Sequence, residues 1–404
     1  MLVLKIFEGH RCPLSVLNLT FLESWHFRHT PRQTLSHTSS KLAGCLTDTQ
    51  PFGCNALFGM QSQPLNTQVI FRINLMTWFK DVFGFEEGSY GHTQAQFDLE
   101  GHQLRSRANQ KSYSVGRFST PSVAQLREAV AFDKGPSVLE HVVIDDVLEI
   151  QGSQKNAGDT FMVASQFNCL EFPVPHATPE DGITGYANDR TQGPACAIGA
   201  APATVYRNYF APVDNTIGQT ADRQINNLSA LERLLGDKPY WQVSNGYVDS
   251  RHDALEALDR RLQEFNQDVL TGALKIGYQR QCDAVFSHRY WLLDAPHPIT
   301  QTFCSAMSIG YSAIPAPNWE GIARVVLDGA YEGTLLAAAH DRDLGTGSGR
   351  VWLTFLGGGV FQNPKSWIRA AIKRALDRTN GLGLQINLAH FRQIDNSYTD
   401  LDNH

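Results

Sequence analysis

A strand that leads directly into three glycines and then into a helix is the feature that most constrains how this chain folds. Residues 351–356 form an apolar run typical of a buried strand, and Gly357-Gly358-Gly359 follow at once. Asn363 is a suitable N-cap, and Pro364 suits the first position of the next helix. Free backbone N–H groups in such a loop, together with the dipole of the following helix, favour a bound phosphate. This segment therefore predicts an anion site.

Two common phosphate-binding loops do not fit this pattern. No Lys-Ser or Lys-Thr pair directly follows a glycine of this loop, as the Walker motif requires, and the spacing does not match the GxGxxG fingerprint of dinucleotide-binding folds. A tight turn that serves only packing is the structural alternative to phosphate binding.

A second stretch, from Phe161 to Phe210, surrounds a long irregular segment. The apolar run 161–164 and the β-branched and aromatic run 204–210 both predict strands. The residues between them are rich in Gly, Pro, Asn, Asp and Thr, and long loops of this kind are often functional. The polar turn 165–169 follows a strand end, which is where open α/β sheets bind ligands.

Composition sets outer limits on the function. The chain has 404 residues, of which 42% are hydrophobic and 18% charged, so a substantial core is expected. A net charge of -6 argues against a general nucleic-acid-binding surface. The seven cysteines form no CxxC pair and, like the histidines, show no regular metal-ligand spacing, which favours a reducing compartment, cytoplasmic or nuclear. No apolar run approaches the roughly 18 residues of a membrane span.

Strands alternate with helices along most of the chain, which predicts an α/β layered domain. We expect a main domain over 137–404 and a small adjunct segment over 66–136. Residues 1–65 are interpreted as an N-terminal extension, either disordered, a targeting segment or an irregular arm. The expected strands include 142–144, 147–150, 161–164, 204–210, 351–356 and 384–388. The expected helices include those capped by Thr120 and Ser250, 228–235 ended by Gly236, 319–339 and the helix from Pro364, with a hairpin at Asn245-Gly246.

Three segments, taken together and in this order, resemble the macrodomain family, an ADP-ribose-binding α/β/α fold. They are VASQFNCLEF (163–172), LTGALKIGYQRQCDAVF (270–286) and LTFLGGGVFQNPKSWIRAAIKRAL (353–376). The resemblance covers roughly 140–390 and implies a three-layer α/β/α sandwich with a mixed central sheet and N-terminal additions. It departs from the family where the usual glycine run after the Asn-containing turn is replaced by residues 182–186 and 191–196. The family's adenine-binding acid has only Asp159 as a candidate.

The resemblance implies a set of ADP-ribose-binding residues. Asn168 matches the residue that binds the distal ribose, and a carboxamide can serve vicinal hydroxyls as donor and acceptor. The structural alternative is that Asn168 caps the strand-end turn. The expected binding residues are Asn168, Gln192, Gly193, Gly357, Gly358, Gly359, Val360, Phe361 as a stacking ring, and Asn363.

Two functions follow from the resemblance: hydrolysis of a glycosidic or ester ADP-ribosyl linkage, or non-catalytic reading of the modification. Hydrolysis needs a group that positions water or moves a proton. Asp189 is the preferred candidate, with Glu171 second and Asn168 in support; acids in such a loop are also commonly just solvated. No cofactor or membrane partner is expected; the expected partner is ADP-ribose or an ADP-ribosylated macromolecule.

An alternative enzyme would use Cys196 as a nucleophile. Cys196 follows a Gln-containing turn and opens a small-residue helix, whose N-terminus could lower the thiol pKa. His176, His288, His297 and His340 are the candidate bases. The competing interpretation is a buried cysteine packed among alanines. Tyr206 and Tyr209 are further candidates for stacking on adenine or ribose, against the alternative that they belong to the core.

Overall fold

The computed structural model of this protein describes residues 77–236 and 238–402. The prediction for residues 1–65 falls outside this range. The described residues all belong to one structural unit.

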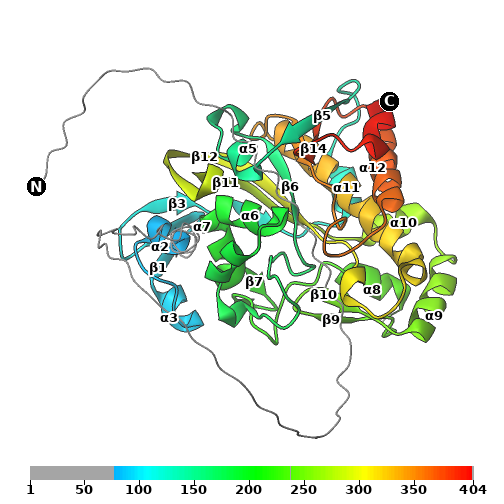
Figure 1. The fold of residues 1–404 in the computed structure, drawn as a ribbon, viewed down its shortest axis with the longest axis horizontal. Coiled ribbons are helices and arrows are strands. Elements are labelled where there is room, and N and C mark those ends of the chain that lie inside the picture. The colour runs from blue at the N-terminus through cyan, green and yellow to red at the C-terminus, as the bar shows by residue number, and fades with distance from the viewer. Residues whose placement is uncertain (1–76, 237, 403–404) are drawn as a thin grey trace, which may run out of the picture. The chain divides into compact units, whose positions relative to one another are not determined.

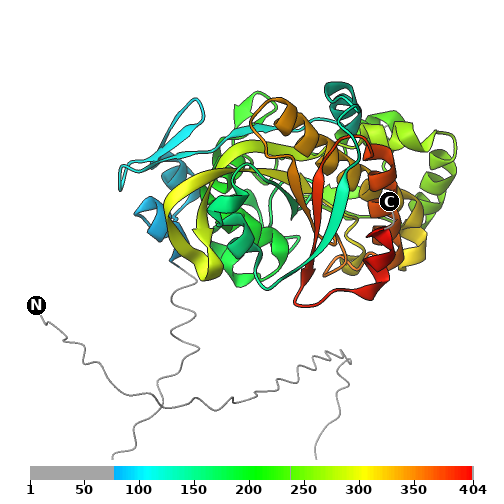
Figure 2. The same cartoon turned by 90° about the horizontal axis from the view of Figure 1, so that it is seen from above.

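A seven-stranded mixed sheet forms the centre of that unit (Figure 1). Its strands, in spatial order, are β4 (Arg117–Ser119), β11 (Gly277–Ser287), β12 (Trp291–Cys304), β6 (Thr160–Ala164), β13 (Arg350–Leu353), β14 (Gln385–Phe391) and β5 (Val138–Ile144). The five strands from β12 to β5 run parallel, whereas β11 is antiparallel to both of its neighbours. Figure 2 shows β11 and β12 as a long curved pair at one side of this sheet. The predicted mixed sheet is confirmed.

Helices cover both faces of the sheet, which confirms the predicted three layers. Side chains alternate along β6, so that Met162 packs on one face while Phe161 and Val163 pack on the other. The first layer contains α4 (Val123–Ala129), α8 (Ser229–Leu235), α9 (His252–Leu262), α10 (Gln267–Ala273), α11 (Glu320–Asp343) and α12 (Lys365–Thr379). The second contains α5 (Val147–Gln151), α6 (Gln192–Gly199), α7 (Ala201–Val205) and the π-helix η4 (Tyr206–Phe210). Within the described ranges, no helix has the length and apolarity needed to cross a membrane.

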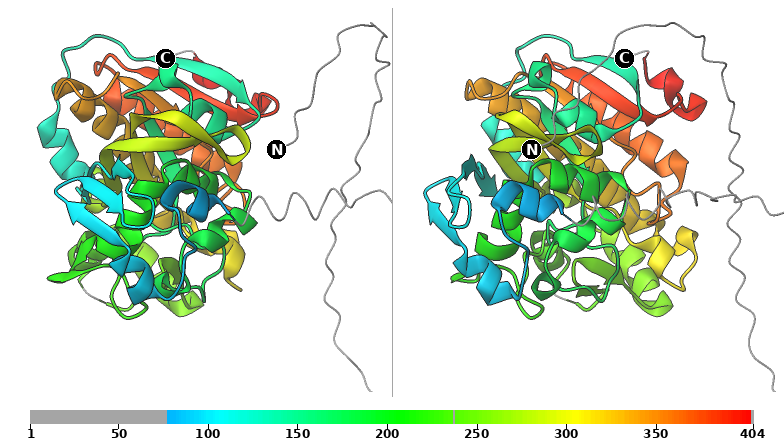
Figure 3. Two further views of the ribbon diagram at one scale, coloured as in Figure 1. Left: turned by 90° about the vertical axis from the view of Figure 1, so that its left-hand side faces the viewer. Right: turned by 60° about the vertical axis from the view of Figure 1, so that its left-hand side comes forward.

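The first described residues form a satellite on the α6 and η4 side. Here α2 (Trp78–Phe83) and α3 (Tyr90–Ala95) lie beside a small sheet, as Figure 3 shows. Its strands are β1 (Phe97–Glu100), β2 (Gln103–Ser106) and β3 (Ser112–Ser114). Trp78 and Phe79 share a hydrophobic cluster with residues of α6 and α7, so this satellite is joined to the main layers by apolar packing. Two short hairpins complete the chain: β7 (Pro212–Val213) with β8 (Thr216–Ile217), and β9 (Gln242–Ser244) with β10 (Tyr247–Asp249).

Local signals predicted several elements correctly. Asn245 and Gly246 have φ values of 48° and 76° in the turn between β9 and β10, as the hairpin prediction required. Gly236 ends α8 with a φ of 99°. The strands expected near 142–144, 161–164, 351–356 and 384–388 and the helix at 319–339 are present as β5, β6, β13, β14 and α11.

Two predicted strands are helical instead. Residues 204–210 form the end of α7 and the π-helix η4, which continue the small-residue helices before them. Helical structure is favoured here because α7 packs against β3 and β11, while η4 packs against α3 and buries Tyr209 in the cluster shared with the satellite. Residues 147–150 form α5, which the Asp146 side chain caps by accepting from the Leu148 N–H at 2.9 Å.

Three helix starts differ by one or two residues from the prediction. Ser122, in a capping box with Gln125, begins α4 in place of Thr120. Arg251, not Ser250, precedes α9. Pro364 occupies the N-cap position of α12, so Asn363 lies one residue before the cap.

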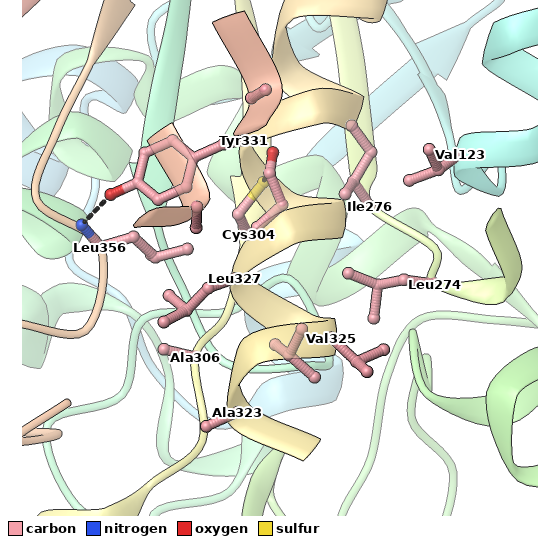
Figure 4. Packing of buried hydrophobic residues seen from close by; sticks show 14 of the residues in the cluster. Val123, Leu274, Ile276, Cys304, Ala306, Ala323, Val325, Leu327, Tyr331 and Leu356 are labelled. Atoms are coloured by element: carbon pink, nitrogen blue, oxygen red, sulfur yellow. Dashed lines mark hydrogen bonds between the residues drawn. The ribbon is translucent and has the colours of Figure 1, made fainter. Parts of the chain in front are cut away.

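The long helix α11 anchors the loop that follows β13. Figure 4 shows Tyr331 of α11 directed towards the start of this loop. Its hydroxyl donates to the Thr354 carbonyl at 2.8 Å and accepts from the Leu356 N–H at 2.9 Å. Tyr331 is fully buried, and the same two backbone groups also bond each other, since the Leu356 N–H donates to the Thr354 carbonyl at 2.9 Å. The hydroxyl therefore joins this tight turn to α11 through two further hydrogen bonds.

We expect Tyr331→Phe to lower the free energy of unfolding by about 1–3 kcal/mol and to speed amide exchange in residues 354–361, because the turn loses both of its hydrogen bonds to α11. Urea denaturation and hydrogen exchange would measure both effects. Tyr113→Phe is the matched control, since its buried hydroxyl also bonds a carbonyl, that of Val82 at 3.1 Å, in the satellite. Equal exchange in the loop of both variants would contradict the anchoring role.

Candidate functional site

A crevice opens at the carboxyl edge of the sheet, between β6 and β13. These parallel strands pair only at Thr160 with Val351 and at Phe161 with Trp352, and then diverge. The helix that follows β6 packs on one face of the sheet, and the helix that follows β13 packs on the other. Connections that leave in opposite directions create a topological switch point, which is where open α/β sheets bind ligands.

The Gln192 side chain fills the gap that the diverging strands leave. Its carboxamide oxygen accepts from the Ala164 N–H at 2.9 Å, and its nitrogen donates to the Met162 carbonyl at 2.7 Å. It thereby replaces a neighbouring strand for two backbone groups of β6. The same contacts attach the N-terminus of α6 to the crevice.

Two chambers meet in this crevice. The first has a cavity volume of about 170 Å³ and lies between the β6 turn, the N-terminal end of α6 and the loop after β13; we call it the glycine-loop chamber. The second has a volume of about 320 Å³ and lies between the ends of β5, β13 and β14; we call it the aromatic chamber. The residues common to both linings are Thr191, Gln192, Thr354 and Phe355.

The glycine-loop chamber offers unpaired backbone donors. Gly357, Gly359, Val360 and Phe361 line it, and within the described ranges their N–H groups make no hydrogen bond. Gly357 has a φ of 75°, and a Cβ there would lie 2.4 Å from that of Ala306, so the turn requires glycine. Successive free N–H groups in a turn form an anion-binding concavity.

The aromatic chamber has apolar walls, and its charged lining residues are Asp145, Asp146 and Arg190. Its walls include Phe161, Trp352, Phe355 and Phe391, and Phe391 is 63% exposed. The exposed residue Asp145 lies at the turn after β5 and makes no hydrogen bond or ion pair within the described ranges. An aromatic slot with a free acceptor suits a flat ring that carries an amino group.

The predicted acid Glu171 lines the glycine-loop chamber and is fully buried in an ion pair. Both of its carboxylate oxygens lie 3.2 Å from one guanidinium nitrogen of Arg207, which is itself fully buried. Arg207 also donates to the Cys169 carbonyl at 2.8 Å and to Gln279 at 3.0 Å. Burial raises the pKa of the Glu171 carboxyl to about 7, although Arg207 and Tyr186 oppose that rise.

The second predicted acid, Asp189, is half-buried at the entry to α6. One carboxylate oxygen accepts from the Thr191 N–H at 2.8 Å. Asp189 lines the same chamber as Glu171 and the glycine loop. Its second oxygen makes no hydrogen bond in the part of the chain that the structure describes, so it is free to hold a water molecule.

The structure brings most predicted site residues together and separates others. The predicted site residues that line the crevice are Glu171, Asp189, Gln192, Gly357, Gly359, Val360 and Phe361. Asn168, Gly193, Gly358 and Asn363 lie outside both chambers.

Packing explains these four exceptions. The buried Asn168 side chain accepts from the Leu170 N–H at 3.0 Å and donates to Gln224 at 2.9 Å, so it caps the strand-end turn and does not face the crevice. Asn363 donates to the Met307 carbonyl at 2.9 Å and holds the glycine loop from behind. Gly193 is required by close contact, since a Cβ there would lie 1.8 Å from the Ala164 oxygen. At Gly358, a Cβ would lie 3.1 Å from the Ile368 side chain.

The cysteine-nucleophile interpretation is not supported. Cys196 is fully buried, lies outside both chambers and packs with Val163, Cys169 and Phe303. Burial raises the pKa of its thiol well above the ordinary value, which opposes thiolate formation. The candidate bases have other contacts or lie elsewhere: His288 faces Asp146, His297 contacts the Gln151 carbonyl, His340 contacts Tyr278, and His176 is exposed outside both linings.

Three further candidates also lie away from the crevice. Asp159 precedes β6 at the opposite edge of the sheet, where it pairs with Arg350 at 3.2 Å and accepts from Trp352 at 2.9 Å. Tyr209 is fully buried and donates to Glu87 at 2.6 Å, and Tyr206 packs against Phe118. Both tyrosines therefore pack in the interior and do not face the crevice.

Sequence reasoning missed two acids, Asp145 and Asp146, and several rings. Asp145 directly follows the strand now defined as β5, and an acid at a buried strand end was the available signal. Tyr247, Tyr311, Phe355 and Phe391 line the crevice but come from four separate segments, so no local pattern connects them.

No family model matches the sequence, and no curated protein matches it. The chain is similar to solved structures of poly(ADP-ribose) glycohydrolase. For the apo enzyme from Deinococcus radiodurans the identity is 14%, the coverage is 70% of this chain and 88% of that chain, and the TM-score is 0.37. For the same enzyme in complex with ADP-ribose, the identity is 15%, the coverage is 70% of this chain and 90% of that chain, and the TM-score is 0.37. For the Thermomonospora curvata enzyme bound to the inhibitor ADP-HPD, the identity is 12%, the coverage is 80% of this chain and 94% of that chain, and the TM-score is 0.36.

The raised pKa of Glu171 predicts a pH-dependent stability. The unfolded carboxyl titrates near 4.5 and the folded one near 7, so the stability that Glu171 contributes is complete below pH 4.5 and is lost as the pH rises to 7. Relative to Glu171→Gln, the wild type should lose up to about 3 kcal/mol of unfolding free energy over this range. Urea denaturation at several pH values tests this, with the exposed Glu149→Gln as control. Parallel curves for wild type and Glu171→Gln would contradict it.

Proposed function

We propose that the crevice binds ADP-ribose, either free or attached to a macromolecule, in the manner of a divergent macrodomain. The observation that carries this proposal is the row of unpaired N–H groups at Gly357, Gly359, Val360 and Phe361, which share a chamber with the N-terminal end of α6. Neutral donors and a helix dipole together favour a diphosphate. The family resemblance of residues 353–376 supports the same ligand.

The aromatic chamber is then the adenosine site. Adenine would lie among its apolar walls, and the free Asp145 carboxylate would accept from the adenine amino group. Because Asp145 and the glycine loop line adjoining chambers, one nucleoside diphosphate can reach both. The terminal ribose then lies on the Glu171 and Asp189 side of the glycine-loop chamber.

We further propose that the protein hydrolyses the ADP-ribosyl linkage. In this reaction the bond between the terminal ribose C1″ and the leaving atom breaks, a bond from a water oxygen to C1″ forms, and one water proton ends on the leaving group. Asp189 would orient the water through its free oxygen. Glu171, with a pKa of about 7, would exchange a proton near neutral pH. A non-catalytic reader is the alternative, and it requires neither acid.

Calorimetric titration should show binding of ADP-ribose, and weaker binding both of AMP and of the analogue in which inosine replaces adenosine, because inosine lacks the amino group.

Gly359→Asp should weaken ADP-ribose binding by at least about tenfold, since it places a like charge beside the diphosphate. A Cβ at Gly359 meets no atom within 4 Å, so the fold should tolerate the change. The control is Gly185→Asp, which is equally open and lies outside both chambers. Absence of heat with millimolar ADP-ribose would refute the binding proposal.

Asp189→Asn should abolish most turnover of ADP-ribosylated peptide, by about 100-fold or more, while ADP-ribose still binds. Release of ADP-ribose from the peptide, followed by chromatography, measures the rate. Asp181→Asn is the control, because this exposed loop acid lies outside both chambers. A wild-type protein that binds ADP-ribose but releases none from any linkage would establish the reader alternative.

A further inference from the structure

Three aromatic rings from separate segments form one wall of the glycine-loop chamber. Tyr247 belongs to β10, Tyr311 to the 3-10 helix η6 (Ile309–Tyr311), and Phe361 to the glycine loop. Their ring centroids are 5.1, 5.6 and 5.8 Å apart, so the rings pack against one another as a continuous surface, which we call the aromatic wall. Tyr311 is 40% exposed, whereas the other two are nearly buried, so Tyr311 presents the accessible part of this wall.

The charges around this wall have one sign. Among the described residues that line the glycine-loop chamber there are two carboxylates and no Lys, Arg or His. Arg207 compensates Glu171, whereas Asp189 forms no ion pair within the described ranges. Burial raises the pKa of the Tyr247 and Tyr311 hydroxyls; the neighbouring Tyr311 adds to the rise at Tyr247, and the Asp189 carboxylate adds a smaller rise at both. A bound diphosphate would add further negative charge.

From this combination we propose that the chamber selects ADP-ribose attached to a cationic side chain of the guanidinium class, as in an arginine-linked modification. This inference rests on the proposed ADP-ribose binding and concerns the group beyond the terminal ribose. A guanidinium is planar and weakly hydrated, and it stacks on aromatic rings while a nearby carboxylate pairs with it. The exposed ring of Tyr311 supplies the stacking surface, and Asp189 supplies the charge.

Other acceptor classes fit this chamber less well. An anionic acceptor group would meet the uncompensated Asp189 with no cation in the described lining to offset it. A neutral hydroxyl acceptor, such as serine, would gain neither the charge nor the cation–π attraction. The selectivity therefore comes from the acceptor subsite and not from the adenosine or diphosphate contacts.

The test compares two peptides of the same sequence, one ADP-ribosylated on arginine and one on serine, with free ADP-ribose as reference. The readout is affinity where the linkage survives and kcat/KM where it is cleaved. We expect the arginine-linked peptide to exceed the serine-linked one by at least about fivefold at low salt, with a smaller ratio at high salt. Tyr311→Leu should reduce the ratio towards one without changing the affinity for free ADP-ribose. Phe132→Leu, an exposed ring outside both chambers, is the matched control.

The outcomes separate this inference from the proposed function. Binding of free ADP-ribose together with an arginine-to-serine ratio of one or less would overturn the inference and leave the proposed function intact. A ratio above one that Tyr311→Leu does not change would overturn the role of the aromatic wall. Failure of wild-type protein to bind free ADP-ribose would overturn both proposals.

Discussion

The divergence of β6 and β13 is the constraint on which the candidate site depends. Two parallel strands that separate after two residue pairs leave backbone groups without a neighbouring strand, and such groups are costly when buried. The Gln192 carboxamide satisfies two of them and so keeps the gap open for the rest of the crevice. The same residue attaches α6, whose N-terminal end lines both chambers.

Two buried polar contacts then hold the crevice walls in place. Tyr331 bonds the Thr354 carbonyl and the Leu356 N–H, which attaches the glycine loop to the core helix α11. On the opposite wall, Arg207 joins the π-helix η4 to the turn after β6 through Glu171. A buried ion pair is costly to desolvate, so its place beside the glycine-loop chamber is better explained by the positioning of these two segments than by stability.

Local chemistry explains why part of the site could be predicted. The glycines at 357–359 lie in the turn after β13, where residue type limits the backbone conformation. The acids at 171 and 189 lie in the long segment between β6 and α6, which its composition marked as a functional loop. The alternating strands and helices also predicted an α/β layered domain, and the family resemblance implied a mixed sheet between two helical layers; the structure confirms both. The error at 204–210 has a physical cause, since a β-branched and aromatic run packs equally well on a buried helix, and here η4 must carry Arg207 to its partner.

The sequence by itself therefore determined the layered α/β class and the glycine turn after β13, because both depend on contacts between residues close in the chain. Only the tertiary structure decided which side chains face the crevice. Asn168 and Asn363 have suitable chemistry, yet backbone groups brought near by folding use their carboxamides. Conversely, Asp145 and Tyr311 join the site only because the carboxyl ends of parallel strands and their loops meet at one edge of the sheet.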